Sequence, residues 1–163
     1  MDAFVQPLYE LADFDAIIRQ LKKPGIVQVS GCLDSQKAHF TNGLLREFPF
    51  RLIVAENDLK AKAFYEDFRL YDPEVLYYPA RDLIFYQADI HGNLLTRQRI
   101  QVLRALLERE EVTIVTSIDS CLDCLVPLAV WKEKVIKIRN DSEIDLDRMK
   151  RHLLELGYEW AAQ

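Results

Sequence analysis

The sequence has few of the residues that mark several large classes of protein. Cysteine accounts for 3 of 163 residues, which excludes a disulfide-stapled scaffold and fits a reducing compartment. The longest apolar runs fall far short of the roughly 20 residues of a membrane-spanning helix. The N-terminus lacks the basic and apolar segments of a secretory signal. The sequence therefore predicts a cytoplasmic protein.

An excess of positive charge is also missing. The formal net charge is −5, whereas a free-standing nucleic-acid-binding chain usually carries a basic face. Half of the residues are hydrophobic and 29% are charged, a balance that supports a buried core and argues against disorder. The composition predicts a folded domain for which nucleic acid is not the main ligand.

Short apolar runs alternate with amphipathic segments along most of the chain. Strands are predicted at 26–29, 50–54, 75–78 and 112–116, and helices at 8–22, 36–47, 57–71 and 94–109. A long connection is expected at 79–93, with a turn at 89–93. The run at 112–116 is continuously apolar or β-branched, as is typical of a central parallel strand. This alternation predicts an α/β fold with a parallel sheet flanked by helices.

The pattern changes after Pro127. A polar-alternating strand is predicted at 134–139 and a helix at 145–156, which Gly157 should end as its C′ residue. We therefore expect a sheet domain at 1–131 and the first part of a small α+β domain at 132–163. One strand and one helix cannot close a core, so the second domain is expected to be truncated.

Residues 31–38, Gly-Cys-Leu-Asp-Ser-Gln-Lys-Ala, carry part of a phosphate loop. The full motif, G-x-x-x-x-G-K-[ST], lies between a strand and a helix. Gly31 and Lys37 have the required spacing, but Gln36 replaces the second glycine and Ala38 replaces the hydroxyl residue that ligates Mg²⁺. Asp34 adds a negative charge to a loop that would have to bind anionic phosphate groups. From the pattern alone, a degenerate loop and a chance Gly–Lys spacing are about equally supported.

No second motif restores nucleotide chemistry. The strand at 112–116 leads into Thr116-Ser117-Ile118-Asp119, without the carboxylate pair that would hold a metal and activate water. A trio of Ser117, Asp119 and His91 is mostly chance in a chain with three histidines. Cys121 and Cys124 have redox-like spacing, but we expect two half-buried core thiols on a short helix. We predict no catalytic residue, no metal site and no cofactor for this chain.

The segment 77–89, Tyr-Tyr-Pro-Ala-Arg-Asp-Leu-Ile-Phe-Tyr-Gln-Ala-Asp, is the most distinctive part of the sequence. Together with Arg97-Gln98-Arg99, the helix to Leu107 and the run at 112–117, it resembles the N-terminal region of the bacterial transcription-repair coupling factor (Mfd). That region is similar to the excision-repair protein UvrB. The resemblance covers nearly the whole chain and implies a RecA-like, phosphate-loop-type domain with a small inserted domain.

The resemblance also implies a function. In the family the inserted domain contacts UvrA and recruits the repair machinery to a stalled RNA polymerase. UvrB has a working phosphate loop and coupling factors have a degraded one, which the segment 31–38 fits. The connection at 79–93 is short where UvrB has a hairpin that wedges into DNA. The parent protein would be an ATP-dependent DNA translocase whose motor domains, with their ATP and Mg²⁺, lie C-terminal to this chain, as does its polymerase-binding domain.

Candidate UvrA-binding residues lie near the end of the chain. Family members carry an arginine after the Gly-Tyr pair, whereas this sequence departs from the pattern with Glu159. The candidates are Arg148, Arg151, Tyr158, Glu159 and Trp160. The alternative for Tyr158 and Trp160 is a place in a core, and for the two arginines a solvated helix face. Core packing is also favoured over base stacking for four aromatic residues: Tyr77, Tyr78, Phe85 and Tyr86.

Two alternatives to an interaction module stay open at this point. One is a nucleotide-dependent or nucleic-acid-processing protein in which Lys37 still functions. The other is a UvrB-like DNA-binding module that uses the arginines of the helix predicted at 94–109, namely Arg97, Arg99, Arg104 and Arg109.

Overall fold

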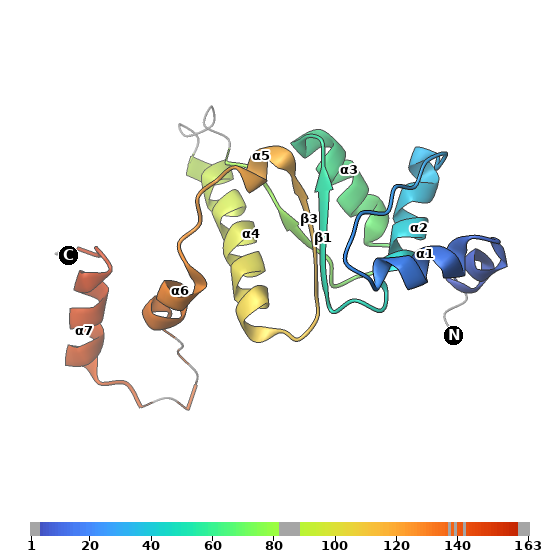
Figure 1. Ribbon diagram of the computed structural model, residues 1–163. Helices are drawn as coiled ribbons and strands as arrows, with labels where there is room; N and C mark the ends of the chain where they lie inside the picture. Colours follow the sequence, from blue (N-terminus) through green and yellow to red (C-terminus); the bar gives the residue numbers. More distant parts are fainter. Residues whose placement is uncertain (1–3, 82–88, 137, 139, 142, 160–163) are drawn as a thin grey trace. The chain divides into compact units, whose positions relative to one another are not determined.

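The structure, a computed structural model, describes residues 4–81, 89–136, 138, 140–141 and 143–159 (Figure 1). The chain divides into two compact units, Met1–Asp123 and Cys124–Gln163, which are called here the first and second unit. The predicted division into domains at 1–131 and 132–163 stays a prediction. Within the described residues, no helix is both long and apolar enough to cross a bilayer.

A parallel sheet of three strands forms the centre of the first unit. The strands are β1 (Phe50–Ala55), β2 (Leu76–Tyr78) and β3 (Val112–Ser117), in the spatial order β1-β3-β2. The register pairs Phe50 with Val112 and Leu76 with Ile114. Every residue of β3 is buried, as expected for a central strand covered on both faces. The predicted α/β class with a parallel sheet flanked by helices is confirmed.

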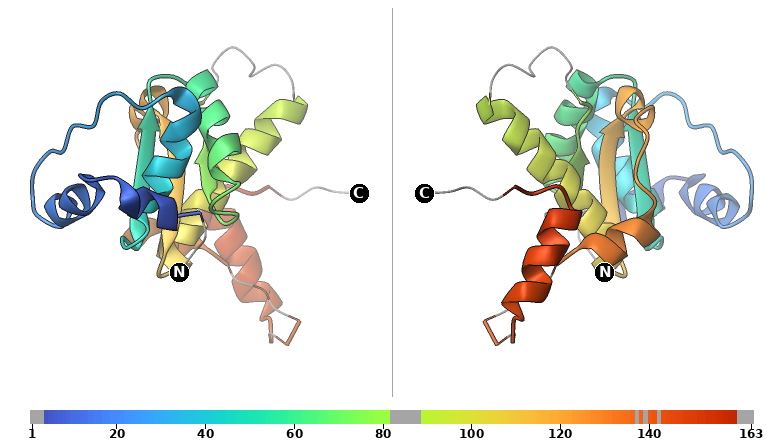
Figure 2. Two further views of the ribbon diagram at one scale, coloured as in Figure 1. Left: turned by 90° about the vertical axis from the view of Figure 1, so that its right-hand side faces the viewer. Right: turned by 90° about the vertical axis from the view of Figure 1, so that its left-hand side faces the viewer.

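Helices cover the two faces of the sheet (Figure 2). On one face, α2 (Asp34–Leu45) and α3 (Asp58–Phe68) bury a cluster that includes Ala38, Phe68 and Val115. On the other face, α4 (Asp89–Glu108) packs on β2 and β3 through a cluster that includes Val102 and Ile114. The helix predicted at 94–109 is therefore confirmed as part of α4. The predicted turn at 89–93 is wrong, because the backbone of these residues is already helical.

The N-terminal segment forms a small cluster of its own against α2. It contains the 3₁₀ helix η1 (Gln6–Glu10) and α1 (Phe14–Leu21), whose buried side chains pack against Phe40 and Leu44. A Cβ on Gly43 would lie 3.0 Å from the Phe14 ring, so glycine permits this close approach. The single helix predicted at 8–22 is wrong. Leu11 has an extended backbone (ψ 125°) and divides it in two.

The strand predicted at 26–29 is also wrong. These residues are unpaired, Ile26 is 95% exposed, and the segment between α1 and α2 runs as an open loop away from the strands (Figure 2). A four-residue apolar run has the composition of a buried strand, but a strand forms only where an edge of the sheet accepts it. The strand that should precede a phosphate loop is therefore missing from the sheet.

The second unit contains α6 (Leu128–Lys134) and α7 (Leu146–Glu155). The strand predicted at 134–139 is wrong for the described residues: Lys134 ends α6, and Val135, Ile136 and Ile138 are exposed and unpaired. Helix α6 was not predicted. The helix predicted at 145–156 is confirmed as α7, which has no buried residue.

Both ends of α7 show why the sequence predicts it well. The Asp145 side chain accepts hydrogen bonds from the backbone N–H groups of Asp147 and Arg148, which caps the N-terminus. At the other end Gly157 has a φ of +89°, and the N–H of Tyr158 donates to the carbonyl of Leu153 at 3.1 Å. This is the Schellman motif that the sequence predicted at Gly157.

Candidate functional site

The segment 31–38 does not have the geometry of a phosphate loop. Gly31 takes a positive φ of +87°, but α2 already begins at Asp34. Gln36, Lys37 and Ala38 therefore lie on the first turns of a helix and not in a loop that closes around an anion. With the segment at 26–29 unpaired, the arrangement of strand, loop and helix that cradles phosphate is not formed.

The groups that would bind an anion here are paired with their neighbours. Lys37 Nζ lies 2.6 Å from Asp34 Oδ1, and this hydrogen bond and charge hold the pKa of Asp34 below its usual range. The backbone N–H of Leu33 donates to Gln36 Oε1 at 3.2 Å. Ala38 is buried in the core beside Val115. The two polar contacts each join residues three positions apart, so Lys37 and Gln36 are paired within the segment itself.

A different set of polar residues gathers at the carboxyl ends of the strands. The Asp58 carboxylate, at the start of α3, accepts a 2.5 Å hydrogen bond from Ser117 Oγ and a 3.2 Å bond from the backbone N–H of Ala80. Ser117 is the last residue of β3 and directly precedes α5 (Ile118–Cys121). The N–H of Ser120 donates to the hydroxyl of Ser117. Asp58 therefore connects α3, α5 and the ends of β2 and β3.

Tyr77 lies next to this cluster. Its hydroxyl donates to the backbone carbonyl of Asp58 at 3.4 Å. Burial, together with the negative charge of Asp58, raises the pKa of Tyr77 to about 12. The phenol therefore stays neutral across the physiological range and acts as a hydrogen-bond donor, not as a base.

Arg99 is the most buried arginine that the structure describes, with 7% of its surface exposed. Its Nη1 donates to the carbonyl of Pro79 at 2.8 Å, and its Nη2 lies 2.8 Å from Asp123 Oδ2. The guanidinium also stacks over the Tyr78 ring, 4.2 Å from the centroid. Burial raises the pKa of Tyr78, while the positive charge of Arg99 opposes that shift.

These contacts remove Arg99 from the DNA-binding alternative. Arg99 faces the interior, so it is not a phosphate contact. Arg104 pairs with Glu108 at 2.8 Å, and Arg109 pairs with Glu74 at 3.2 Å. Arg97 is exposed. The four arginines therefore do not act together as one free cationic surface.

A cavity of about 610 Å³ lies at the opposite edge of the sheet, where the strands begin. Its lining mixes both signs of charge and includes Arg51, Arg109, Asp72 and Glu74. Within it, Thr113 Oγ1 donates to Asp72 Oδ2 at 2.6 Å. Ligands of open α/β sheets bind at the carboxyl ends of the strands, so this position favours a structural role.

The candidate partner-binding residues of the second unit are exposed where they are described. Arg148, Arg151 and Glu159 lie at the surface, and Tyr158 is 64% exposed. Tyr158 is therefore not packed into a core of the described residues, and partner binding by these residues stays a prediction. Trp160 lies outside the described residues.

Other predicted residues have mixed outcomes. Tyr78 is buried and Tyr77 half-buried, which confirms core packing for both, while Phe85 and Tyr86 lie outside the described residues. Ser117 donates to Asp58 and so is not part of a nucleophile–base trio. Cys121 and Cys124 are exposed, so the prediction of half-buried thiols is wrong. Among the described residues, no three acidic, histidine or cysteine side chains gather as metal ligands would.

The sequence patterns did not predict the contacts of two charged residues, Arg99, which is buried, and Asp58, which is partly buried. Asp58 begins a helix shortly after a strand, and a carboxylate at that place can reach the ends of the neighbouring strands. Arg99 had a clearer signal. It lies four residues after Leu95 and three before Val102, and so on the apolar stripe of α4.

Comparison with known proteins finds relatives along most of the chain, although no family model matches. The chain is 28% identical over 164 residues to the transcription-repair-coupling factor of Bacillus subtilis, covering 98% of this chain and 14% of that protein. It is 29% identical over 143 residues to UvrABC system protein B of Treponema denticola, covering 88% of this chain and 20% of that protein.

A third relative, UvrABC system protein B of Thermosipho africanus, is 31% identical over 111 residues, which is 68% of this chain and 16% of that protein. The chain thus spans between 14 and 20% of the length of these three relatives. The predicted resemblance is confirmed: this chain is similar in sequence, over most of its length, to transcription-repair coupling factors and to UvrB.

Proposed function

We propose that this chain is the N-terminal interaction module of a transcription-repair coupling factor, and that it recruits UvrA to stalled RNA polymerase without hydrolysing nucleotide. Its similarity to coupling factors and to UvrB carries the proposal and supports a role in nucleotide excision repair. The parent protein is then a cytoplasmic, ATP-dependent DNA translocase that contacts RNA polymerase and duplex DNA through other domains, where its ATP and Mg²⁺ also bind.

The absence of nucleotide chemistry in this module is supported by the pairing of Lys37. A phosphate-loop lysine must reach phosphate oxygens, whereas Lys37 is bound to Asp34 at 2.6 Å. The module therefore needs no cofactor. We expect no heat of ATP binding with Mg²⁺ by calorimetry for the wild type and for Lys37→Ala. Micromolar binding that Lys37→Ala abolishes would instead support the nucleotide-dependent alternative.

Partner binding is assigned to the second unit because its candidate residues are exposed. Arg148 and Arg151 lie on α7, and Tyr158 and Glu159 follow that helix. The four apolar residues of α7 all stay at least partly accessible, since no residue of this helix is buried. Such an uncovered amphipathic helix is suited to a protein surface.

Capture of purified UvrA by the immobilised chain tests this assignment. We expect the wild type to retain UvrA and the double variant Arg148→Glu, Arg151→Glu to retain much less. Reversing two charges of the binding surface turns electrostatic attraction to UvrA into repulsion. A matched charge reversal in the first unit, Arg69→Glu, should have no effect. Equal capture by all three proteins would contradict the assignment, and salt-dependent retention of duplex DNA would favour the UvrB-like alternative.

A further inference from the structure

The chain makes several contacts with distant residues where it leaves β2. Four consecutive residues each contact a different part of the first unit, and each contact spans a long stretch of sequence. The contacts are Tyr78 O with Thr116 Oγ1 at 2.8 Å, Pro79 O with Arg99 Nη1 at 2.8 Å, Ala80 N with Asp58 Oδ2 at 3.2 Å and Arg81 Nε with Asp123 Oδ2 at 3.8 Å.

Arg99 joins two of these places at once. One arm of its guanidinium holds the carbonyl of Pro79, and the other lies 2.8 Å from the carboxylate of Asp123. The planar fork of arginine makes two contacts in fixed directions, which the single ammonium of lysine does not reproduce. The Tyr78 ring lies under the guanidinium and keeps it from turning.

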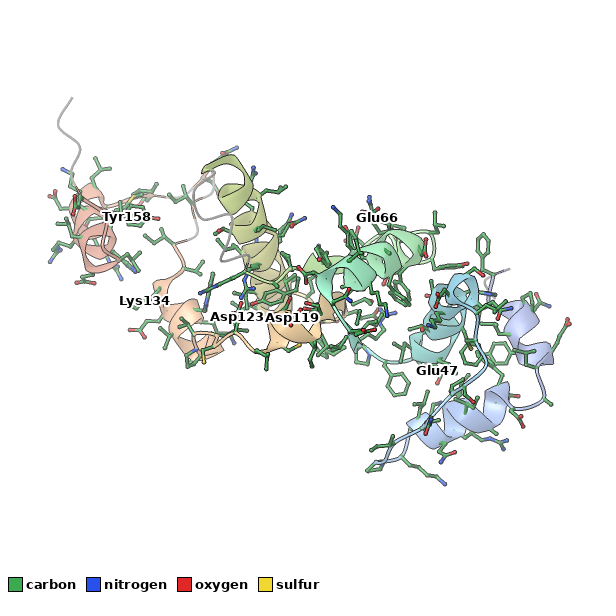
Figure 3. The ribbon with its side chains drawn as sticks, turned by 90° about the horizontal axis from the view of Figure 1, so that it is seen from above. Glu47, Glu66, Asp119, Asp123, Lys134 and Tyr158 are labelled. Atoms are coloured by element: carbon green, nitrogen blue, oxygen red, sulfur yellow. The ribbon has the colours of Figure 1, made fainter. Side chains whose placement is uncertain are left out.

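Asp123 is the last residue of the first unit, and the second unit begins at Cys124. Figure 3, which views the carboxyl ends of the strands, labels Asp123 close to Asp119 of α5. Within the segment from Asp119 to Asp123, Ser120 contacts Ser117 and Asp58, and the N–H of Leu122 donates to the carbonyl of Asp119 at 3.3 Å. At the end of this segment, Asp123 lies 2.8 Å from Arg99 and 3.8 Å from Arg81, so Arg99 makes the closer of the two ion pairs.

We propose that Arg99 is a positioning residue that fixes the point at which the chain leaves the first unit, and that partner capture by the second unit depends on it. Arg99 is itself too buried to contact a partner. The second half of this proposal rests on the proposed function, whereas the first half does not.

Amide hydrogen exchange of the full chain tests the first half. In Arg99→Met we expect the amides of residues 119–123 to exchange about 10- to 100-fold faster, because the partly buried ion pair with Asp123 is lost. Arg99→Lys should lie between Arg99→Met and the wild type. The matched control is Arg104→Met on the same helix, whose side chain is 73% exposed and should leave these amides unchanged.

Asp123→Asn keeps the shape of the side chain that pairs with Arg99 but removes its charge. This variant tests the same contact if Arg99→Met folds poorly. It should accelerate the same amides while those of β3 keep their protection. Unchanged exchange at 119–123 in both variants, or equal acceleration of Val115 in the core, would overturn the positioning role.

Capture of UvrA tests the second half. We expect Arg99→Met to weaken capture about 2- to 30-fold, the range for residues that act on a binding site without touching the ligand. Undiminished capture together with accelerated exchange would overturn the link to the partner. If the wild type itself captures no UvrA, the proposed function fails, and the exchange result alone decides whether Arg99 fixes the exit segment.

Discussion

The segment 31–38, where a phosphate loop was expected, differs from the carboxyl ends of the strands in how its polar groups are paired. Lys37 pairs with Asp34 on the first turn of α2, three residues away, and both side chains are at least half exposed. At the strand ends, Asp58 accepts bonds from Ser117 and Ala80, which come from distant parts of the sequence. In a phosphate-loop ATPase the loop is the centre of the site. Here the interactions that join distant elements lie at the strand ends.

The difference has an energetic meaning. An exposed ion pair on one helix contributes little to stability, because water screens it and side-chain entropy opposes it. Removing a carboxylate that accepts hydrogen bonds from several buried donors is costly. The donors are left without an acceptor and cannot reach water. The loop can therefore change with little cost to the fold, while Asp58 and its partners cannot.

Removal of Asp58 should have the largest effect. We expect Asp58→Ala to lower the free energy of unfolding by about 2 to 4 kcal/mol, because Ser117 is fully buried and loses its acceptor. Urea denaturation followed by circular dichroism measures this loss. Asp67→Ala, an exposed change on the same helix, is the control. A loss no greater than that of the control would show that the strand ends are as tolerant as the loop.

A smaller loss is expected from the neighbouring bond to β2. Thr116→Val keeps the shape of the side chain but leaves the buried carbonyl of Tyr78 without its 2.8 Å donor. We expect a loss of about 1 kcal/mol in the free energy of unfolding. A midpoint identical to that of the wild type would mean that the carbonyl finds another donor, and that Thr116 is not needed to hold the chain at this point.

The two regions should also differ in their response to pH. The folded pKa of Tyr77 is raised to about 12 from an ordinary value of 10.0, so its neutral form stabilises the fold below pH 10 and this contribution is lost as the pH rises toward 12. We expect the urea midpoint of the wild type to fall over that range, and that of Tyr77→Phe to fall less. Parallel curves for the two proteins would exclude this role for Tyr77.

The corresponding experiment on the loop should show almost nothing. The folded pKa of Asp34 lies below its ordinary value of 3.8, so its contribution is present above that pH and lost as the pH falls through the folded pKa. Because the pair with Lys37 is exposed, we expect no measurable difference in urea midpoint between the wild type and Lys37→Ala at neutral pH. A clear loss in Lys37→Ala would show that the loop still supports the fold.

Sequence patterns predicted those parts of the fold that local chemistry decides. The continuous apolar run of β3 and the C-terminal cap of α7 at Gly157 were predicted, because each needs only residues that are neighbours in sequence. The segment at 26–29 has a similar composition to β3, yet it is unpaired. Whether this segment forms a strand depends on an available edge of the sheet, and the composition of the segment does not determine that.

The candidate site shows the same limit. The losses at Gln36 and Ala38 were visible in the motif, because a motif is a local pattern. The hydrogen bond between Asp58 and Ser117 was not visible, because it joins positions that only the finished sheet brings together. Arg99 was mistaken for part of a surface because arginine is mostly exposed in proteins, although its place on the apolar stripe of α4 argued otherwise.

The order of the strands has a consequence for the growing chain during synthesis. The central strand β3 is the last of the three in sequence, and β1 and β2 pair with it and not with each other. Neither outer strand can therefore find its partner until the ribosome has released the chain beyond Ser117. Until then Ile53 and Ala55, which pack against the core of the finished fold, belong to an unpaired apolar strand, the kind of segment that chaperones protect from aggregation.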